Sequence, residues 1–158
     1  MSRSLQDQLA DHFEPPRNEV TPWNPSRRAT ARVPDPLPAP THCPHCGRPV
    51  QIVKNSVIYF GKEYGEWPWA FWCRPCDAYV GLHPFTGIPL GTLATRPMRD
   101  ARKKAKALFN ELWQGGAMTR SAAYAWASKV LKLPPNETHI AMFDVATCER
   151  LIAEIRKR

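Results

Sequence analysis

The sequence predicts an α+β fold: a zinc-ribbon-like module of antiparallel β-hairpins, then a three-helix C-terminal part, preceded by a proline-rich N-terminal arm. Two Cys-x-x-Cys units, Cys43–Cys46 and Cys73–Cys76, enclose a stretch rich in β-branched and aromatic residues, as in a zinc ribbon. Three amphipathic segments with a helical period follow from Pro97. We therefore divide the chain into residues 1–40, 41–94 and 95–158.

Residues 1–40 are predicted to form an arm that has no core of its own. Leu5, Leu9 and Phe13 recur at every fourth position, which places them on one face of a short helix ending before a pair of prolines. Further prolines follow at short intervals up to Pro40 and favour an extended or disordered chain. The alternative is an arm that docks on a partner through Trp23, Arg27 and Arg28.

The two Cys-x-x-Cys units predict a structural zinc site. Each unit can bring two thiolates to one ion, and two units complete the tetrahedral all-thiolate shell that structural zinc prefers. A redox motif would occur once, and a disulfide pair does not suit the reducing cytoplasm indicated by the lack of a secretory signal. The predicted zinc ligands are Cys43, Cys46, Cys73 and Cys76. We interpret the adjacent His42 and His45 as neighbours of these ligands, although either could replace one cysteine.

Three strands are predicted in the zinc-ribbon-like module. Val50–Phe60 has the composition of two β-rich runs with a break near Asn55, and Trp67–Trp72 that of a third strand. The long gap between the cysteine pairs is taken up by a hairpin tip at residues 61–65. Alternation places three aromatic residues on one face of the sheet, namely Trp67, Trp69 and Phe71. We expect this face to pack against the following helices; the alternative is that it stacks nucleic-acid bases.

A loop over residues 84–95, which contains glycine and proline, connects the module to three predicted helices. These helices span residues 97–113, 120–132 and 145–157. Thr119 and Asp144 are predicted to cap the second and third helices, because their side chains can accept a hydrogen bond from the first turn. Cys148 lies on the apolar stripe of the last helix, so we expect a buried thiol rather than a metal ligand or nucleophile.

The chain carries a formal net charge of +8, and this charge is concentrated in the predicted helices. In residues 1–40 acidic and basic side chains balance, whereas residues 97–158 hold an excess of about six positive charges. At about 100° per residue, four cations fall on one flank of the first helix: Arg99, Arg102, Lys103 and Lys106. We expect this flank to contact nucleic-acid phosphates or an acidic partner surface; a solvated face is the alternative.

Residues of the module and of the helices form one combined pattern. It consists of Cys73-x-Pro75-Cys76-Asp77-Ala78-Tyr79-Val80-Gly81-x-His83, Pro89-Leu90-Gly91-Thr92-Leu93-Ala94, Arg99, Arg102, Trp113, Arg120, Tyr124, Trp126, His139, Ile140, Phe143 and Cys148. With this pattern the chain resembles, over about residues 41–155, the zinc-finger-containing domain of unknown function found in phage, prophage and mobile-element proteins. The resemblance implies an origin in a phage or mobile element and leaves two functional classes open.

The sequence contains no recognisable enzyme motif. The five histidines lie in no phosphate loop, nucleophile elbow or H-E-x-x-H frame, and the acidic residues are too scattered for a two-metal site. No stretch approaches the length of a membrane span. We therefore expect a non-enzymatic zinc-binding accessory protein of the bacterial cytoplasm that binds nucleic acid through its basic helical face. The alternative is a protein-binding modulator or inhibitor of a host enzyme or defence complex, such as an anti-CRISPR or transcription-modulating protein.

Overall fold

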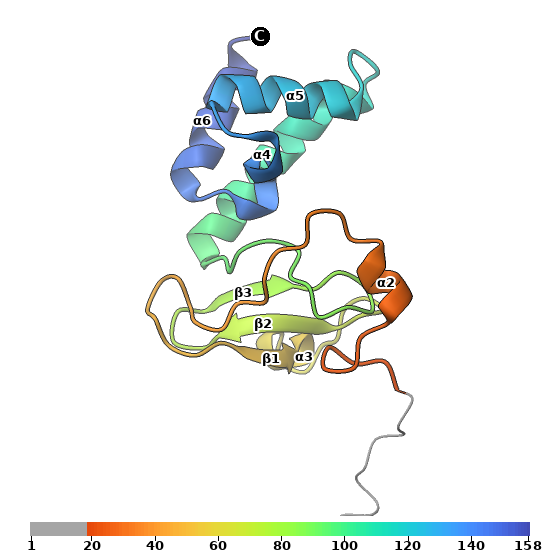
Figure 1. The fold of residues 1–158 in the computed structure, drawn as a ribbon. Coiled ribbons are helices and arrows are strands. Elements are labelled where there is room, and N and C mark those ends of the chain that lie inside the picture. The colour runs from red at the N-terminus through yellow and green to blue at the C-terminus, as the bar shows by residue number, and fades with distance from the viewer. Residues whose placement is uncertain (1–18) are drawn as a thin grey trace, which may run out of the picture.

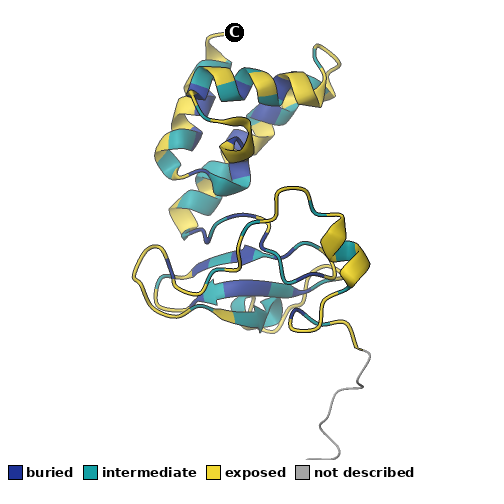
Figure 2. Ribbon diagram, in the orientation of Figure 1, coloured by how far each residue is buried: buried dark blue, intermediate teal, exposed yellow. Residues whose placement is uncertain are grey.

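The chain folds into a sheet half, residues 19–95, and a helical half, residues 96–158 (Figure 1). The computed structural model describes residues 19–158, so the short helix predicted around Leu5–Phe13 lies outside the described residues. Each half has its own cluster of buried apolar side chains (Figure 2). Among residues 19–158, no helix is both long and apolar enough to cross a membrane.

The sheet half is built on three short antiparallel strands in the order β1 (Gln51–Lys54), β2 (Trp69–Cys73) and β3 (Ala78–Gly81). Ile52 pairs with Phe71 and Phe71 with Val80, so these three side chains form a row on one face. The row continues into buried cysteines and into Leu93 of the loop that follows the sheet. Strands of four or five residues bury few side chains, and a core this small gains stability from a bound metal.

The second predicted β-run is wrong. Asn55–Ile58 forms a helical turn, α3, and the chain then closes a loop before β2. The side-chain amide of Asn55 donates to the carbonyl of Tyr64 at 2.8 Å and accepts from the backbone N–H of Tyr64 at 3.2 Å. These two bonds hold the loop closed and outweigh the β-propensity of the residues between them. The connection from β1 to β2 is therefore longer than the tip predicted at residues 61–65.

The described part of the N-terminal arm contains a helix that the sequence did not predict. Ser26 begins this helix, α2 (Arg27–Ala31), because its hydroxyl accepts from the backbone N–H of Ala29 at 3.2 Å. The indole of Trp23 packs edge-on against Trp69, with ring centroids 5.2 Å apart. The prolines favour an extended arm, but these contacts fix its path across the sheet half.

The aromatic face of β2 was predicted to pack against the helices, and this prediction is wrong. The face packs within the sheet half. Phe71 is buried in the sheet core, and Trp69 meets the arm. The ring of Trp67 lies 5.4 Å from that of Phe85, and its indole N–H donates to the carbonyl of Thr86 at 3.0 Å. The arm and the loop before the helices therefore cover this face, because both fold back across it.

The helical half consists of α4 (Arg96–Gln114), α5 (Arg120–Leu131), α6 (Val145–Arg156) and two 3₁₀ turns, η1 (Pro135–Glu137) and η2 (Ile140–Met142). Both predicted caps are confirmed. The Thr119 hydroxyl accepts from the N–H of Ala122 at 3.1 Å, and the Asp144 carboxylate from that of Thr147 at 2.7 Å. The core between the helices is filled by residues that include Phe109, Leu131, Cys148 and Leu151.

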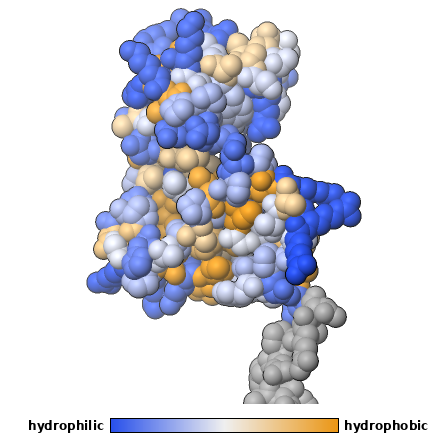
Figure 3. Space-filling view, in the orientation of Figure 1, coloured by the Kyte–Doolittle hydropathy of each residue, from blue (hydrophilic) through white to orange (hydrophobic). Residues whose placement is uncertain are grey.

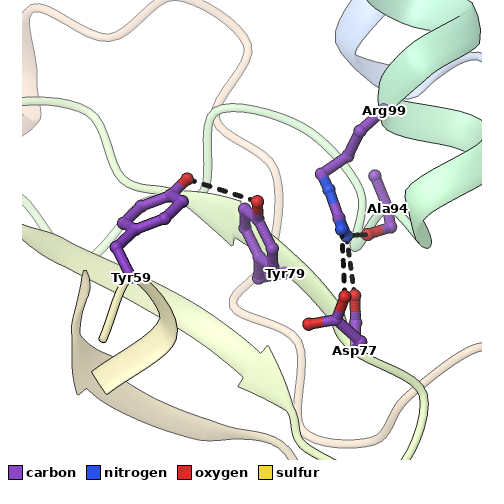
Figure 4. A network of polar contacts seen from close by, with 5 residues as sticks. All are labelled: Tyr59, Asp77, Tyr79, Ala94 and Arg99. Carbon is purple, nitrogen blue, oxygen red and sulfur yellow. Dashed lines mark hydrogen bonds and ion pairs between the residues drawn. The ribbon is translucent and has the colours of Figure 1, made fainter. Parts of the chain in front are cut away.

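Arg99, near the start of α4, ties the two halves together (Figure 4). Its guanidinium donates to the carbonyls of Asp77 and Ala94 at 2.6 and 2.7 Å and forms an ion pair with the Asp77 carboxylate at 3.1 Å. The guanidinium also lies 4.0 Å from the ring centroid of Tyr79 in β3, and the Tyr79 hydroxyl accepts from that of Tyr59. Asp77 directly follows the second cysteine pair, so this joint attaches α4 to the cysteine turns.

A second contact joins the halves at residues 91–92. The backbone N–H of Thr92 donates to the carbonyl of Ala141 in η2 at 3.0 Å. Gly91 lies so close to the same carbonyl that a Cβ at this position would collide with it. Glycine is therefore required here by lack of space.

Candidate metal centre and basic groove

All four predicted zinc ligands meet in the structure. The Sγ atoms of Cys43, Cys46, Cys73 and Cys76 lie within 4.8 Å of one another, and those of Cys46 and Cys73 are 3.5 Å apart. Four sulfurs around one zinc ion at about 2.3 Å would be separated by about 3.8 Å, so the cluster has the size of a tetrahedral site. All four thiols are free of disulfides. The donor set and its geometry therefore fit a structural zinc ion.

Each cysteine pair is held by a tight turn. In the first turn, the N–H of Gly47 donates to the carbonyl of Cys43 at 2.8 Å, and a φ of +75° at Gly47 favours glycine. The N–H of His45 points to the Cys43 Sγ at 3.4 Å. In the second turn, the N–H of Asp77 donates to the carbonyl of Arg74 at 3.1 Å, with a φ of +46° that aspartate tolerates better than most residues. These turns direct the thiols of each pair to one side.

Hydrogen bonds and burial shift the pKa values of three thiols in the cluster. A hydrogen bond from the backbone N–H of Arg48 is the main cause that lowers the pKa of Cys46 to about 7. The pKa of Cys76 is raised to about 12, mainly by its hydrogen bond to Cys46, and burial raises the pKa of Cys73. Cys46 thus forms a thiolate more readily than Cys73 and Cys76 do. A divalent cation can displace the thiol protons and bind all four sulfurs as thiolates.

The histidines beside the cysteine pairs lie outside the cluster. The His45 Nε2 atom is 3.0 Å from the carbonyl oxygen of Leu93, and the His42 Nδ1 atom is 3.0 Å from the hydroxyl of Thr41. His45 therefore links the first cysteine turn to the loop that leads into α4. The fifth cysteine, Cys148, lies in the core of the helical half, where burial raises the pKa of its thiol.

Comparison of the sequence with known protein families supports the assignment of the four-cysteine cluster as a zinc site. A model of the zinc-finger-containing domain family matches residues 39–158, which include both the cysteine turns and all the helices of the helical half. The chain belongs to this family. A search of the curated proteins and a search of the solved structures each found no match. Family membership and the four-cysteine cluster together assign a structural zinc ion to this zinc-finger-containing domain.

The basic flank predicted on the first helix is divided in the zinc-finger-containing domain. Arg99 turns toward the sheet half, and its side chain is only 16% exposed. Arg102 is half-buried and donates to three oxygens of the surrounding loops at 2.6 to 2.9 Å. Only Lys103 and Lys106 of the four are exposed. The two arginines turn inward because the loops beside α4 leave backbone carbonyls that need donors.

A groove of about 870 Å³ lies between the two halves of the zinc-finger-containing domain. One side is formed by α4 and the start of α5, and the other by the N-terminal arm and the loop before α4. Its lining holds four cations and one carboxylate, namely Arg102, Lys103, Lys106, Arg120 and Asp35. The volume lies within the range of ligand-binding sites in proteins. Three of the four predicted basic residues therefore meet at this groove, and Arg99 does not.

The groove is also lined by residues outside the predicted basic flank, among them Arg120, Tyr124 and His139. The Arg120 guanidinium lies 5.8 Å from the ring centroid of Trp113 and 5.4 Å from that of Tyr124. The rings of Tyr124 and His139 are 6.1 Å apart. The spacing of Arg120 and Tyr124 by four residues does place both on one face of a helix. Arg120 also contacts Trp113 at the end of α4, and Tyr124 contacts His139 just before η2. These are tertiary contacts, which helical periodicity does not predict.

Proposed function

We propose that this chain is a non-enzymatic zinc-binding accessory protein of a phage or mobile element, and that it binds nucleic acid without reading its sequence. The observation that carries the proposal is the charge of the groove, where four cations meet one carboxylate. Within residues 19–158, the ion pairs are Arg99–Asp77 and Lys157–Glu154, so none of the four groove cations is paired with a carboxylate there. Their charge is available to phosphates.

Arg102 supports an anionic ligand more strongly than a mobile surface lysine would. Its three hydrogen bonds, to the carbonyls of Phe143 and Thr92 and to the Thr92 hydroxyl, hold the guanidinium in one place. Arginine has five N–H donors, so two remain for a ligand. Burial lowers the pKa of Arg102, yet an arginine stays charged at neutral pH. Arg102 forms no ion pair within residues 19–158, although the charge of Asp144 acts on it from nearby. A fixed, half-buried positive charge of this kind favours an incoming phosphate.

The zinc ion has a positioning role in this proposal. It fastens the two cysteine turns, and each turn contacts the segment that enters α4: His45 binds the carbonyl of Leu93, and Asp77 binds Arg99. The groove lies between the halves that these contacts join. On the face that Figure 3 shows, the helical half is mostly hydrophilic, and more strongly hydrophobic side chains reach the surface on the sheet half. This distribution agrees with a partner that binds through charge on the helical side.

The proposal is tested by the salt dependence of binding to labelled DNA. If four groove cations each neutralise one phosphate, a plot of log affinity against log salt concentration has a slope of about −3 to −4. The double variant Lys103→Gln/Lys106→Gln removes two of these cations without lowering helix propensity. We expect its slope to fall to about half and its melting temperature to stay unchanged.

A matched control removes the same charge elsewhere. Lys104 and Lys129 are exposed and do not line the groove, so Lys104→Gln/Lys129→Gln should leave both slope and affinity nearly unchanged. Equal losses in the two double variants would mean that net charge, not the groove, attracts DNA, and would contradict the assignment to the groove. Absence of binding by the unmodified protein even at about 50 mM salt would overturn the proposed function.

One observation favours the second candidate, a protein-binding modulator. Around α3 the sheet half exposes Val57, Tyr59, Phe60 and Tyr64, and Phe60 is fully exposed. Exposed aromatic clusters are typical of protein–protein interfaces. This candidate predicts that a bacterial protein co-purifies after nuclease digestion and is lost with Phe60→Ser. The nucleic-acid proposal predicts instead that nucleic acid co-purifies, that nuclease removes it, and that Phe60→Ser does not change its amount.

A further inference from the structure

The groove continues beyond its cationic part into a second hollow of about 580 Å³. Three side chains line both spaces and so lie at their boundary, which we call the ridge, namely Arg120, Tyr124 and His139. The second hollow contains no carboxylate in its lining. Two neighbouring hollows on either side of one ridge suit a chain of repeating units better than a single compact ligand.

The ridge presents flat π-systems, which is the feature that nucleic-acid bases use for stacking. The guanidinium of Arg120 lies over the rings of Trp113 and Tyr124, and the ring of Tyr124 is tilted by 51° to that of His139. Arg120 and His139 are exposed, so their planes are accessible from the solvent. Aromatic rings and guanidinium planes stack on bases of any sequence, because every base has a π-face.

Charge and stacking are arranged in the order that a single strand requires. Arg102, Lys103 and Lys106 line the first hollow and can meet phosphates, while the ridge lies at the boundary with the second hollow. The remainder of the first hollow mixes polar side chains and the carboxylate of Asp35 with apolar side chains such as Leu90 and Ile140, and the apolar ones suit a base rather than a phosphate. In a duplex the bases are paired and stacked on one another, so only phosphates could reach this site.

We propose that the groove binds single-stranded nucleic acid, with successive bases stacked on either side of the Arg120–Tyr124–His139 ridge and with phosphates bound by Arg102, Lys103 and Lys106. This inference rests on the proposed function and narrows it to a class of nucleic acid. The ring of Tyr124 provides a stacking plane, and its contact with Phe109 at 4.8 Å anchors that plane in the helical core. Arg120 supplies both a plane and a charge.

The test measures binding of labelled thymidine and uridine strands of about 12 nucleotides, a duplex of the same length, and a mononucleotide. We expect the single strands to bind at least about tenfold more tightly than the duplex and the mononucleotide. Comparison of the thymidine and uridine strands shows whether the groove prefers deoxyribose or ribose. Tyr124→Leu keeps an apolar contact with Phe109 but removes the ring, and should weaken single-strand binding at least about fivefold. Tyr124→Phe keeps the ring and should bind as the unmodified protein does.

Two further variants separate stacking from folding. His139→Ala removes an exposed ridge ring and should weaken binding to single strands without lowering the melting temperature. Phe60→Leu removes an exposed aromatic ring that does not line the groove and should have no effect. Equal binding of single strand and duplex, or equal affinity of Tyr124→Leu and Tyr124→Phe, would overturn the single-strand inference while leaving the proposed function intact. A mononucleotide that binds as tightly as the strand would identify a small-ligand site instead. Failure of every nucleic acid to bind would overturn both.

Discussion

The five cysteines of this chain occupy two environments that give the thiol opposite chemistry. Cys46 is exposed, and the backbone N–H of Arg48 lowers its pKa to about 7, which favours the thiolate that a metal requires. Cys148 has no exposed surface and lies among apolar side chains of the helical half, where burial raises its pKa and favours the thiol. The same type of side chain thus serves as a metal ligand at one position and as an inert core residue at another, and the groups around each cysteine decide which.

At this scale we predict that Cys148 can be replaced without loss of zinc. Cys148→Ala should retain one zinc per chain and cost about 1–2 kcal/mol of unfolding free energy, because it leaves only a small cavity in the helical core. Cys148→Ser should cost about 1 kcal/mol more, because its buried hydroxyl would lack a partner. Elemental analysis and thermal unfolding measure the two effects. Loss of zinc in the alanine variant would show that our assignment of the zinc ligands is wrong.

The element that decides the geometry of the groove is the loop of residues 84–95. It covers the aromatic face of β2 through Phe85 and Thr86, supplies Leu93 to the sheet core, and meets η2 at Gly91. The carbonyl of Ala94 also accepts a hydrogen bond from Arg99. A segment without a helix or a strand of its own therefore carries several of the contacts that join the two halves, beside the pair of Arg99 and Asp77.

Gly91 is the most demanding position of this loop. Gly91→Ala should lower the unfolding free energy by about 2 kcal/mol or more, because its Cβ would collide with the carbonyl oxygen of Ala141 and the loop or η2 would have to move. Gly115→Ala is the matched control. Gly115 has a φ of −76° at the end of α4, and its added methyl would meet the nearest atom at an ordinary 3.6 Å. Chemical denaturation should show little change for Gly115→Ala, and equal effects in both variants would contradict the argument from close approach.

On the scale of the whole molecule, the two halves have separate cores. The sheet core contains Cys43 and Cys73, whereas the helical core is built on Phe109, Leu131 and Leu151 and contains no proposed zinc ligand. The stability of the sheet half should therefore depend on the metal, because its short strands bury little. The helical half should depend on it only through the joint.

Removal of zinc by a chelator should unfold the sheet half first. We expect tryptophan fluorescence to report exposure of the aromatic face of β2, while far-UV circular dichroism keeps most of its helical signal. Hydrogen exchange should become fast in β1 to β3 and remain slow in α4 and α6. Cys73→Ser should reproduce the chelated state, and added zinc should reverse chelation but not the substitution. A single transition that unfolds both halves together would contradict the view of two separate cores.

Local chemistry made some elements predictable. The cysteine pairs follow from spacing alone, because two residues between cysteines suit one tight turn. The caps at Thr119 and Asp144 were predictable because capping is a contact within one turn of helix. The helix at Asn55–Ile58 was not, since the bonds between Asn55 and Tyr64 span nine residues and override local β-propensity. Arg99 and Arg102 lie on the predicted flank, but the carbonyls that turn them inward belong to distant loops.

By itself, the sequence determined the α+β composition, the four zinc ligands, the family and the excess of positive charge on the helices, because each depends on residue types at short spacing. Which cations line the groove depends on the tertiary structure alone. Arg120, Tyr124 and His139 line the same groove as Lys103 and Lys106, from which they are separated by 14 to 36 residues of chain, because α5 and η2 pack beside α4. Helical periodicity sets which face of a helix a residue occupies. Periodicity does not determine which face of another element lies opposite that face. The groove forms where such faces of different elements lie opposite each other.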